Sequence, residues 1–187
     1  MKTIALLAFF SAVLMINAKL PSSTYIIKST EYGTNWDVCS SSSLCGGTFG
    51  NIFNNPSYSD EWQQFIVTAL PSGFYTIKSY SNNLFVTAAA DSGNPIDTLF
   101  LSAENSSPSQ QFAITSRPDG SYFVKPREAS YLAFEAPSST FEDLYLATKG
   151  CSSTVQRFIF QDQNLAIAMK SLKSSSSPRR TENSEAL

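Results

Sequence analysis

Gln63-Gln64-Phe65 is the stretch that decides the fold, because two further copies of it follow along the chain. The later copies are Gln110-Gln111-Phe112 and Gln156-Arg157-Phe158, and the three phenylalanines are separated by 47 and then 46 residues. A constant period of this length is typical of repeat proteins, in which each unit is too small to bury its apolar residues alone. The sequence therefore predicts three similar units that share one core.

The residues before each triplet repeat as well. A short run that ends in Lys opens each unit, at Tyr25-Ile26-Ile27-Lys28, Tyr75-Thr76-Ile77-Lys78 and Tyr122-Phe123-Val124-Lys125. A second apolar stretch precedes each triplet, at Ile52-Phe53, Leu99-Phe100-Leu101 and Leu144-Tyr145-Leu146. Turn residues separate these stretches, so we expect four short strands per unit and twelve in all. The triplet phenylalanines should lie near the shared axis, and each triplet Gln should bond backbone of its own unit because a buried amide needs partners.

Three units that each end in Gln-x-aromatic resemble the ricin-B-type β-trefoil family, whose hallmark is a Gln-x-Trp triplet; Phe stands here in place of Trp. The resemblance extends from about Tyr25 to Phe160. It implies an all-β trefoil with pseudo-threefold symmetry, which we place at residues 19–165. It also implies a lectin-like, carbohydrate-binding function, although one fold can carry many functions.

Residues 1–18 have the pattern of a secretory signal peptide. Lys2 is followed by an almost unbroken apolar run from Ile4 to Ile16, and Ala18 is a small residue suited to cleavage. The alternative, a membrane anchor, is disfavoured because the run is too short to span a bilayer comfortably. We therefore expect a secreted, extracellular protein without membrane insertion.

The C-terminal segment, residues 166–187, is expected to be a disordered tail. The repeat pattern stops after Asp162, and the segment contains a run of serines and mixed charges. One helical turn is expected at Leu165–Met169.

The trefoil body is acidic. Residues 19–165 contain 8 basic and 13 acidic residues, a net charge of −5. Nucleic-acid binding requires a basic surface that displaces counterions, so a nucleic-acid partner is not expected.

Secretion favours disulfide bonds among the three cysteines. Cys39 and Cys45 flank a short loop, which makes them the natural pair, although sequence alone leaves the connectivity open. Cys151 then has three alternatives: a free thiol, an intermolecular bridge, or pairing with one of the other two. Asn105 begins a glycosylation sequon, with Pro108 just after it.

The family pattern implies one sugar site per unit, built from an Asp on the second strand, an aromatic residue on the third strand and the triplet Gln. A carboxylate accepts hydrogen bonds from sugar hydroxyls, and an aromatic ring covers the apolar side of the sugar. In the first unit these positions fall on Asp37, Phe53 and Gln63, and we expect Asn54 or Asn55 to supply the amide that Trp62 displaces. The alternatives are that Asp37 bonds local backbone and that the aromatic residues are core.

The other two units look degenerate by the same pattern. The second unit has Thr87 at the Asp position and keeps Phe100. In the third unit the Asp position falls on Phe134, with Glu135 on the opposite face of an ideal strand and Tyr145 as the aromatic residue. One degenerate sugar site, in the first repeat, is therefore expected.

The sequence argues against an enzyme. It contains no histidine, so neither a Ser-His-Asp nor a Cys-His arrangement can form, and no metal or other cofactor is expected. The alternative function is a secreted β-trefoil protease inhibitor or protein-binding effector, with the Cys39–Cys45 loop presented to a protease or another protein partner.

Overall fold

The computed structural model describes residues 19–38, 51–56, 60–89, 97–139, 142–148 and 153–175. The predicted signal peptide and the residues Cys39, Cys45 and Cys151 lie outside these ranges. The disulfide prediction and the cleavage prediction therefore stay predictions.

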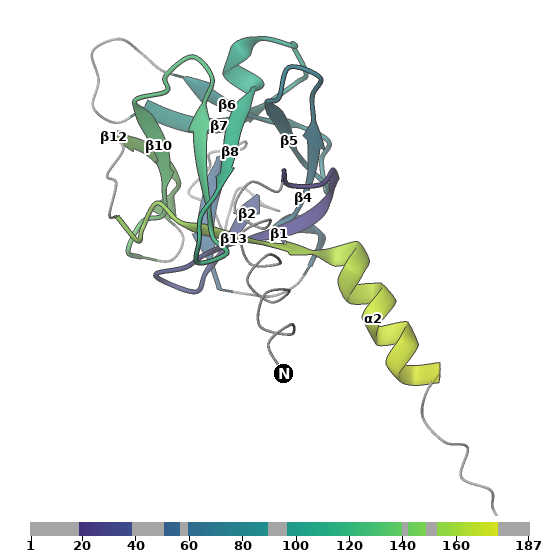
Figure 1. Cartoon of the computed structure of the whole chain (residues 1–187). Coiled ribbons are helices and arrows are strands. Elements are labelled where there is room, and N and C mark those ends of the chain that lie inside the picture. The colour runs from purple at the N-terminus through teal and green to yellow at the C-terminus, as the bar shows by residue number, and fades with distance from the viewer. Residues whose placement is uncertain are drawn as a thin grey trace, which may run out of the picture.

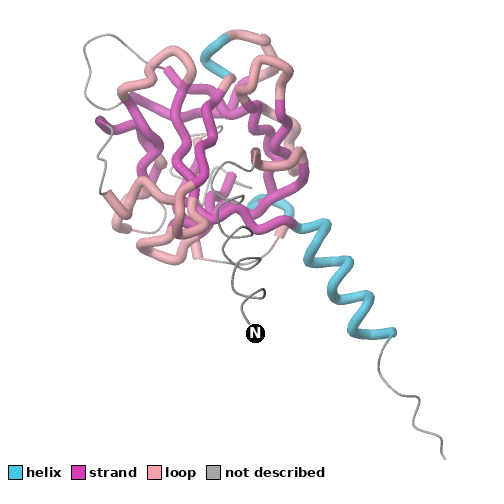
Figure 2. The backbone as a smooth tube through the Cα atoms, in the orientation of Figure 1, coloured by secondary structure: helices cyan, strands magenta, loops and turns pink. Residues whose placement is uncertain are grey.

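Within the described ranges the chain forms one 13-stranded sheet, two short 3-10 helices and one α-helix (Figures 1 and 2). The strands are β1 (Ser23–Ser29), β2 (Asn35–Val38), β3 (Ile52–Asn55), β4 (Gln64–Ala69), β5 (Tyr75–Ser79), β6 (Phe85–Ala89), β7 (Asp97–Ser102), β8 (Phe112–Ser116), β9 (Tyr122–Pro126), β10 (Leu132–Glu135), β11 (Glu142–Asp143), β12 (Tyr145–Thr148) and β13 (Phe158–Asp162). The helices are η2 (Glu61–Gln63), η3 (Pro108–Gln110) and α2 (Gln163–Ser175).

Six of the strands close a barrel. Each repeat contributes its first and last strand, and the antiparallel pairs run β1–β4, β4–β5, β5–β8, β8–β9, β9–β13 and β13–β1. Closure gives each of these six strands a barrel partner on both sides. The all-β trefoil expected from the threefold pattern is confirmed.

Three hairpins, β2–β3, β6–β7 and β10–β12, extend the sheet beyond the six barrel strands. They are joined to one another by the pairs β3–β11 and β7–β12 and by a bridge between Asn51 and Phe100. The third strand of the last repeat is split at the buried Leu144 into β11 and β12. This split explains why the described residues form 13 strands where twelve were expected.

The core is built around Trp36, which the structure buries completely. Its ring lies 5.8 Å from Phe65 and 5.2 Å from Phe158, both edge-on, and stacks on Phe134 with centroids 5.3 Å apart. Phe112 meets Phe134 edge-on at 5.1 Å. The three triplet phenylalanines are therefore held together by Trp36 and Phe134, two residues from second strands of repeats.

Each triplet Gln donates to a backbone carbonyl of its own repeat, as expected. The acceptors are the carbonyl oxygens of Pro56, Ala103 and Thr148, at 2.7, 2.9 and 3.1 Å. All three Gln side chains are buried, so these bonds satisfy amides that have left water.

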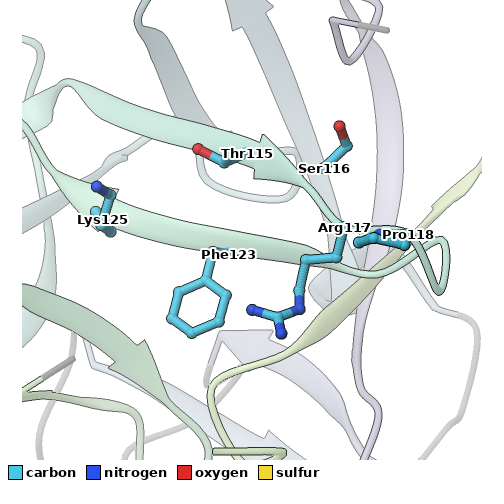
Figure 3. Close-up of a pocket in the computed structure, with 6 residues that line it drawn as sticks. All are labelled: Thr115, Ser116, Arg117, Pro118, Phe123 and Lys125. Carbon is cyan, nitrogen blue, oxygen red and sulfur yellow. The ribbon is translucent and has the colours of Figure 1, made fainter. Parts of the chain in front are cut away.

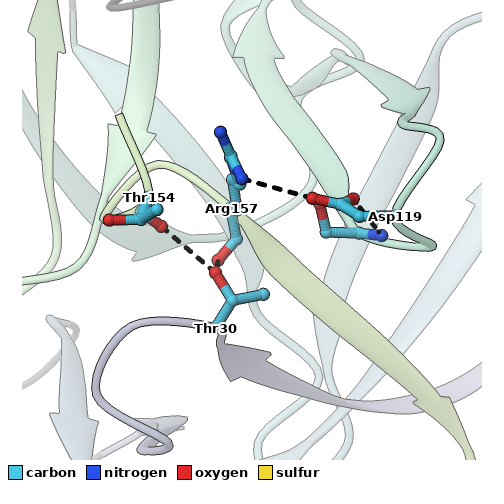
Figure 4. A network of polar contacts seen from close by, with 5 residues as sticks. Thr30, Asp119, Thr154 and Arg157 are labelled. Atoms are coloured by element: carbon cyan, nitrogen blue, oxygen red, sulfur yellow. Dashed lines mark hydrogen bonds and ion pairs between the residues drawn. The ribbon is translucent and has the colours of Figure 1, made fainter. Parts of the chain in front are cut away.

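A polar network ties the first repeat to the third where the barrel closes (Figure 4). The Thr30 hydroxyl lies 3.2 Å from the carbonyl oxygens of both Thr154 and Arg157, and the Thr30 amide donates to Arg157 O over 3.0 Å. The Arg157 guanidinium in turn forms an ion pair with Asp119 at 3.2 Å. The network supplements the β1–β13 pairing beside it.

Helix α2 corrects the tail prediction. The helix runs from Gln163 to Ser175, so residues 166–175 of the expected disordered tail are helical, and residues 176–187 lie outside the described ranges. Asp162 explains the start of the helix, because its Oδ1 accepts from the amides of Asn164 at 2.9 Å and Leu165 at 3.1 Å, as an N-cap does. The helix projects away from the barrel (Figure 1). In the described part of the chain, no helix has the length and apolar character needed to cross a bilayer.

Candidate functional site

The first-repeat site lies on strands β2 and β3. Their register places Asp37 opposite Phe53 and Asn35 opposite Asn55. Opposed residues of an antiparallel pair point to the same side, and so do residues two apart on a strand. One face of this hairpin therefore carries two Asn side chains, one carboxylate and one aromatic ring.

Amide groups hold the Asp37 carboxylate. Asn55 Nδ2 and Gln63 Nε2 both donate to Asp37 Oδ2, at 2.8 and 2.9 Å. Gln63 is itself positioned by a bond from Asn35 Nδ2 to its Oε1 at 2.8 Å. Burial raises the pKa of Asp37, and the hydrogen bonds from Gln63 and Asn55 partly oppose that shift because they favour the ionised form.

Asn54 does not belong to this cluster. It pairs with Trp36 across the hairpin and so faces the other side, where it contacts the Thr34 hydroxyl and donates to Pro137 O at 2.9 Å. Of the predicted site residues, the structure brings together Asp37, Phe53, Asn55 and Gln63 and leaves Asn54 apart.

A second carboxylate flanks Phe53. Asp143 on β11 is opposite Phe53 in the register, so Phe53 lies between Asp37 and Asp143. Asn51 donates to Asp143 Oδ2 at 2.8 Å, and burial raises the pKa of Asp143. Sequence reasoning missed Asp143 because it comes from the third repeat.

The second repeat places Thr87 opposite Phe100, and Gln110 reaches Thr87 and Ser102. Gln110 Nε2 lies 3.1 Å from Thr87 Oγ1 and 3.0 Å from Ser102 Oγ. This equivalent of the first-repeat cluster is held by hydroxyl groups and has no carboxylate among these contacts.

The third repeat corrects the sequence-based alignment. Glu135, not Phe134, occupies the position equivalent to Asp37, because Glu135 lies opposite Tyr145 and receives the amide of Gln156. Gln156 Nε2 donates to Glu135 Oε2 at 2.8 Å, and the Tyr145 hydroxyl donates to Glu135 Oε1 at 2.7 Å. Phe134 is instead the fully buried equivalent of Trp36.

The signal for this alignment was present in the sequence. The residue before each site position is a fully buried apolar one, which gives the triplets Trp36-Asp37-Val38, Val86-Thr87-Ala88 and Phe134-Glu135-Ala136. Aligning the third repeat on that apolar residue would have placed Glu135 correctly.

The phenol of Tyr145 is protonated at neutral pH. Its pKa is raised to about 12, first by burial and then by the hydrogen bond to Glu135, both of which disfavour the phenolate. Glu135 and Tyr145 are half-buried, whereas Asp37 and Phe53 are only 8% and 7% exposed. The third-repeat pair is thus the more accessible of the two carboxylate–aromatic pairs.

The sequon residue Asn105 is exposed at the surface. Its Oδ1 accepts from the Ser107 amide at 3.0 Å, and its own amide donates to Gln110 Oε1 at 2.9 Å. Asn105 therefore begins the turn that leads into the second-repeat triplet. Among the described residues, no group of three or more Cys, Asp or Glu could hold a metal ion.

Solved structures of low sequence identity share this architecture. No protein-family model matches the sequence, and no curated protein matches it either. The designed threefold-symmetric protein ThreeFoil aligns with a TM-score of 0.65 at 17% identity, over 74% of this chain and 98% of its own. A ricin B-like lectin of Macrolepiota procera, solved in complex with lactose, aligns with a TM-score of 0.63 at 12% identity, over 78% of this chain and 99% of its own.

The Rhizoctonia solani agglutinin gives the same TM-score of 0.63, at 14% identity, over 78% of this chain and 99% of its own. Likeness at this level of identity shows the fold. The chain has the β-trefoil fold.

Proposed function

We propose that the protein is a secreted, noncatalytic carbohydrate-binding protein whose sugar sites lie in the first and third repeats. One observation carries this proposal: the triplet Gln donates to a carboxylate in both of these repeats, from Gln63 to Asp37 and from Gln156 to Glu135. In each case an aromatic residue is the cross-strand partner of the carboxylate.

The first-repeat site supplies a fixed acceptor. Both hydrogen bonds that the described residues donate to Asp37 fall on Oδ2, and we place the ligand hydroxyl at Oδ1. Charge-assisted bonds to a carboxylate are stronger than neutral ones. Because the side chains of Asp37 and Phe53 are mostly buried, a ligand would contact only their exposed edges.

The third-repeat site supplies more exposed surface. The half-buried Tyr145 ring offers a face to the apolar side of a sugar, and Glu135 is fixed beside it by two hydrogen bonds. This site goes beyond the single first-repeat site expected from the sequence.

Structural neighbours support the choice of ligand class. A neighbour with the same fold was solved with lactose bound, so β-galactosides are the first probes to use. A shallow site of this kind should bind a monosaccharide at about millimolar Kd, and clustered ligands would raise the apparent affinity.

The test is a glycan array followed by calorimetric titration with the best ligand. We expect Asp37→Asn and Glu135→Gln each to weaken binding about tenfold at their own site, since each removes one charged acceptor. The matched control is Asp119→Asn, which removes an exposed carboxylate from the turn after β8.

Two outcomes would contradict the proposal. One is glycan binding by the folded double variant Asp37→Asn/Glu135→Gln that equals that of the parent. The other is the absence of any saturable glycan binding together with inhibition in a protease panel, which would establish the inhibitor alternative instead.

Secretion is tested separately. We expect the protein, expressed from its full sequence in a eukaryotic host, to appear in the medium with Lys19 as its N-terminal residue. Retention of Met1 on protein from the medium would contradict cleavage at Ala18.

A further inference from the structure

The outer face of the β8–β9 hairpin carries a cavity distinct from the sites described above (Figure 3). The register places Thr115 opposite Phe123 and Ala113 opposite Lys125. Their neighbours Ile114 and Val124 pack into the core, so the side chains of Thr115, Phe123 and Lys125 point away from the barrel interior.

The cavity has a volume of about 340 Å³. Its lining residues are Thr115, Ser116, Arg117, Pro118, Phe123 and Lys125. Two of these six described residues are basic and none is acidic. This is an unusual local charge for a trefoil body whose sequence has a net charge of −5.

Arg117 is held in place against an aromatic ring. Its guanidinium carbon lies 4.9 Å from the centroid of Phe123, a cation–π distance, and Figure 3 shows the two side by side. Arg117 Nε is buried and has no hydrogen-bond partner within the described residues. The side chain is thus ordered before any ligand arrives, which lowers the entropy lost on binding.

The nearby carboxylate is already engaged. Asp119, two residues after Arg117, accepts hydrogen bonds from Ser121 and forms the ion pair with Arg157. The pKa of Asp119 is lowered first by its hydrogen bonds from Ser121 and then, to a smaller extent, by the charges of Arg157 and Arg117. The interaction of Arg117 with Asp119 is thus the weakest of these, and the Arg117 guanidinium can still meet an external anion.

The equivalent hairpin of the previous repeat shows that the fold does not require this arrangement. β4 and β5 are joined by the same Pro-x-Gly turn, and Gly73 and Gly120 both have φ values that favour glycine, +85° and +82°. In the β4–β5 hairpin, Leu70 occupies the position of Arg117 and Thr76 occupies the position of Phe123.

The cavity beside that earlier hairpin has the opposite character. It has a volume of about 130 Å³, and the charged residue among its lining residues is Glu104. The repeat scaffold therefore accepts Leu and Thr at these positions, and the Arg117–Phe123 pair is an addition to one hairpin.

We propose that the β8–β9 cavity binds the acidic group, a sulfate or a carboxylate, of a glycan. The planar guanidinium of Arg117 matches an oxyanion with two parallel N–H donors. Lys125 adds a second positive charge to the lining, on the other side of Phe123 in Figure 3. The Thr115 hydroxyl supplies a neutral donor. The glycan identity of the carrier rests on the proposed function, whereas the oxyanion site rests on Arg117, Phe123 and Lys125 alone.

Nucleic acid is the other polyanion that two cations could contact. It is disfavoured because each phosphate needs a counter-charge, and a body with a net charge of −5 repels a continuous phosphate chain.

The test uses NMR titration of the mature protein with galactose 6-sulfate, glucuronic acid and galactose. We expect the two acidic probes to shift the amides of β8 and β9, and the tighter of the two identifies the preferred oxyanion. Arg117→Leu, which installs the residue found at position 70, should weaken acidic-probe binding about tenfold or more. Lys78→Gln, on the equivalent strand β5, is the matched control and should leave the binding of the acidic probes unchanged.

Three results would overturn the proposal. The first is no shift of the β8 and β9 amides with either acidic probe, and the second is equal binding of the acidic probes by Arg117→Leu and the parent. The third is displacement of galactose 6-sulfate by a short single-stranded oligonucleotide whose phosphate concentration equals that of the sulfate.

The variant Asp37→Asn/Glu135→Gln separates the two proposals. Retained binding of galactose 6-sulfate by this variant, with loss of neutral galactose, supports a separate site; loss of both would place the acidic sugar in the first- or third-repeat site and overturn the β8–β9 assignment.

Discussion

Gln156 donates a hydrogen bond of 2.8 Å from its side-chain amide to the carboxylate of Glu135. The same contact joins Gln63 to Asp37 in the first repeat, at 2.9 Å. In the second repeat the hydroxyl of Thr87 replaces the carboxylate, with Gln110 Nε2 at 3.1 Å. The triplet Gln therefore links the core of each repeat to its outer polar cluster.

Gln110→Ala should destabilise the protein by about 2 kcal/mol, because it leaves buried hydrogen-bonding groups without partners. The Gln110 side chain serves four groups, which are Thr87, Ser102, Ala103 and the Asn105 amide. Gln111→Ala is the control, since its side chain bonds Arg127 at the surface and should cost less than about 0.5 kcal/mol. Urea denaturation of both variants measures the difference, and equal midpoints would contradict it.

Phe134→Ala should destabilise the core by about 3–5 kcal/mol, the range for a buried Phe replaced by Ala. Phe134 stacks on Trp36 and meets Phe112 edge-on, so its loss opens a cavity where the three repeats meet. Tyr131→Ala, at a side chain that is 62% exposed, should change stability by less than about 0.5 kcal/mol. Calorimetric melting of the two variants tests this, and a small effect at Phe134 would mean that the stack is not central to the core.

Stability and sugar affinity should respond to pH in opposite directions through Asp37. Its pKa is raised above 3.8, chiefly by burial, so the folded state binds the proton more tightly than the unfolded state. The contribution of Asp37 to the free energy of unfolding is therefore present below the unfolded pKa and is lost as pH rises through the raised folded pKa. The proposed sugar site uses the ionised carboxylate of Asp37, so affinity should rise over that same interval.

Denaturation and sugar titration at steps from about pH 3 to 7 measure both effects. Asp37→Asn is the reference, because the difference between parent and variant isolates this one carboxylate from all others. A difference that does not vary with pH, in either measurement, would contradict the assignment.

Asp162→Ala should loosen helix α2 without unfolding the barrel. Asp162 caps the helix by accepting from the amides of Asn164 and Leu165, and loss of an N-cap costs about 1 kcal/mol of helix stability. Hydrogen exchange should speed up in α2 and stay slow in β1 and β4. Gln163→Ala, whose side chain bonds only the Gln161 carbonyl among the described residues, is the control. Faster exchange throughout the barrel would show that Asp162 supports the β1–β13 pairing instead.

The sequence by itself determined the trefoil. Three triplets at a near-constant period, each with its own apolar flanks, require three units that share a core. The structure places Phe65 and Phe158 against Trp36, and Phe112 against Phe134, which stacks on Trp36. Local pattern suffices for this because burial of periodic apolar residues is the main force that selects the fold. The resemblance to the ricin-B-type family pointed to Asp37 and Gln63, which the structure joins by a hydrogen bond.

Only the tertiary structure decided which face of the sheet each strand side chain occupies. A shift of one residue turns a strand side chain to the opposite face of a sheet, so Asn54 was wrongly grouped with Asn55, and Glu135 was wrongly set aside in favour of Phe134. Asp143 reaches Phe53 from another repeat, and Arg117 meets Phe123 across a hairpin. Strand pairing joins residues far apart in the chain, and their register depends on the turns and on the packing of all three repeats together, which no local stretch of sequence records.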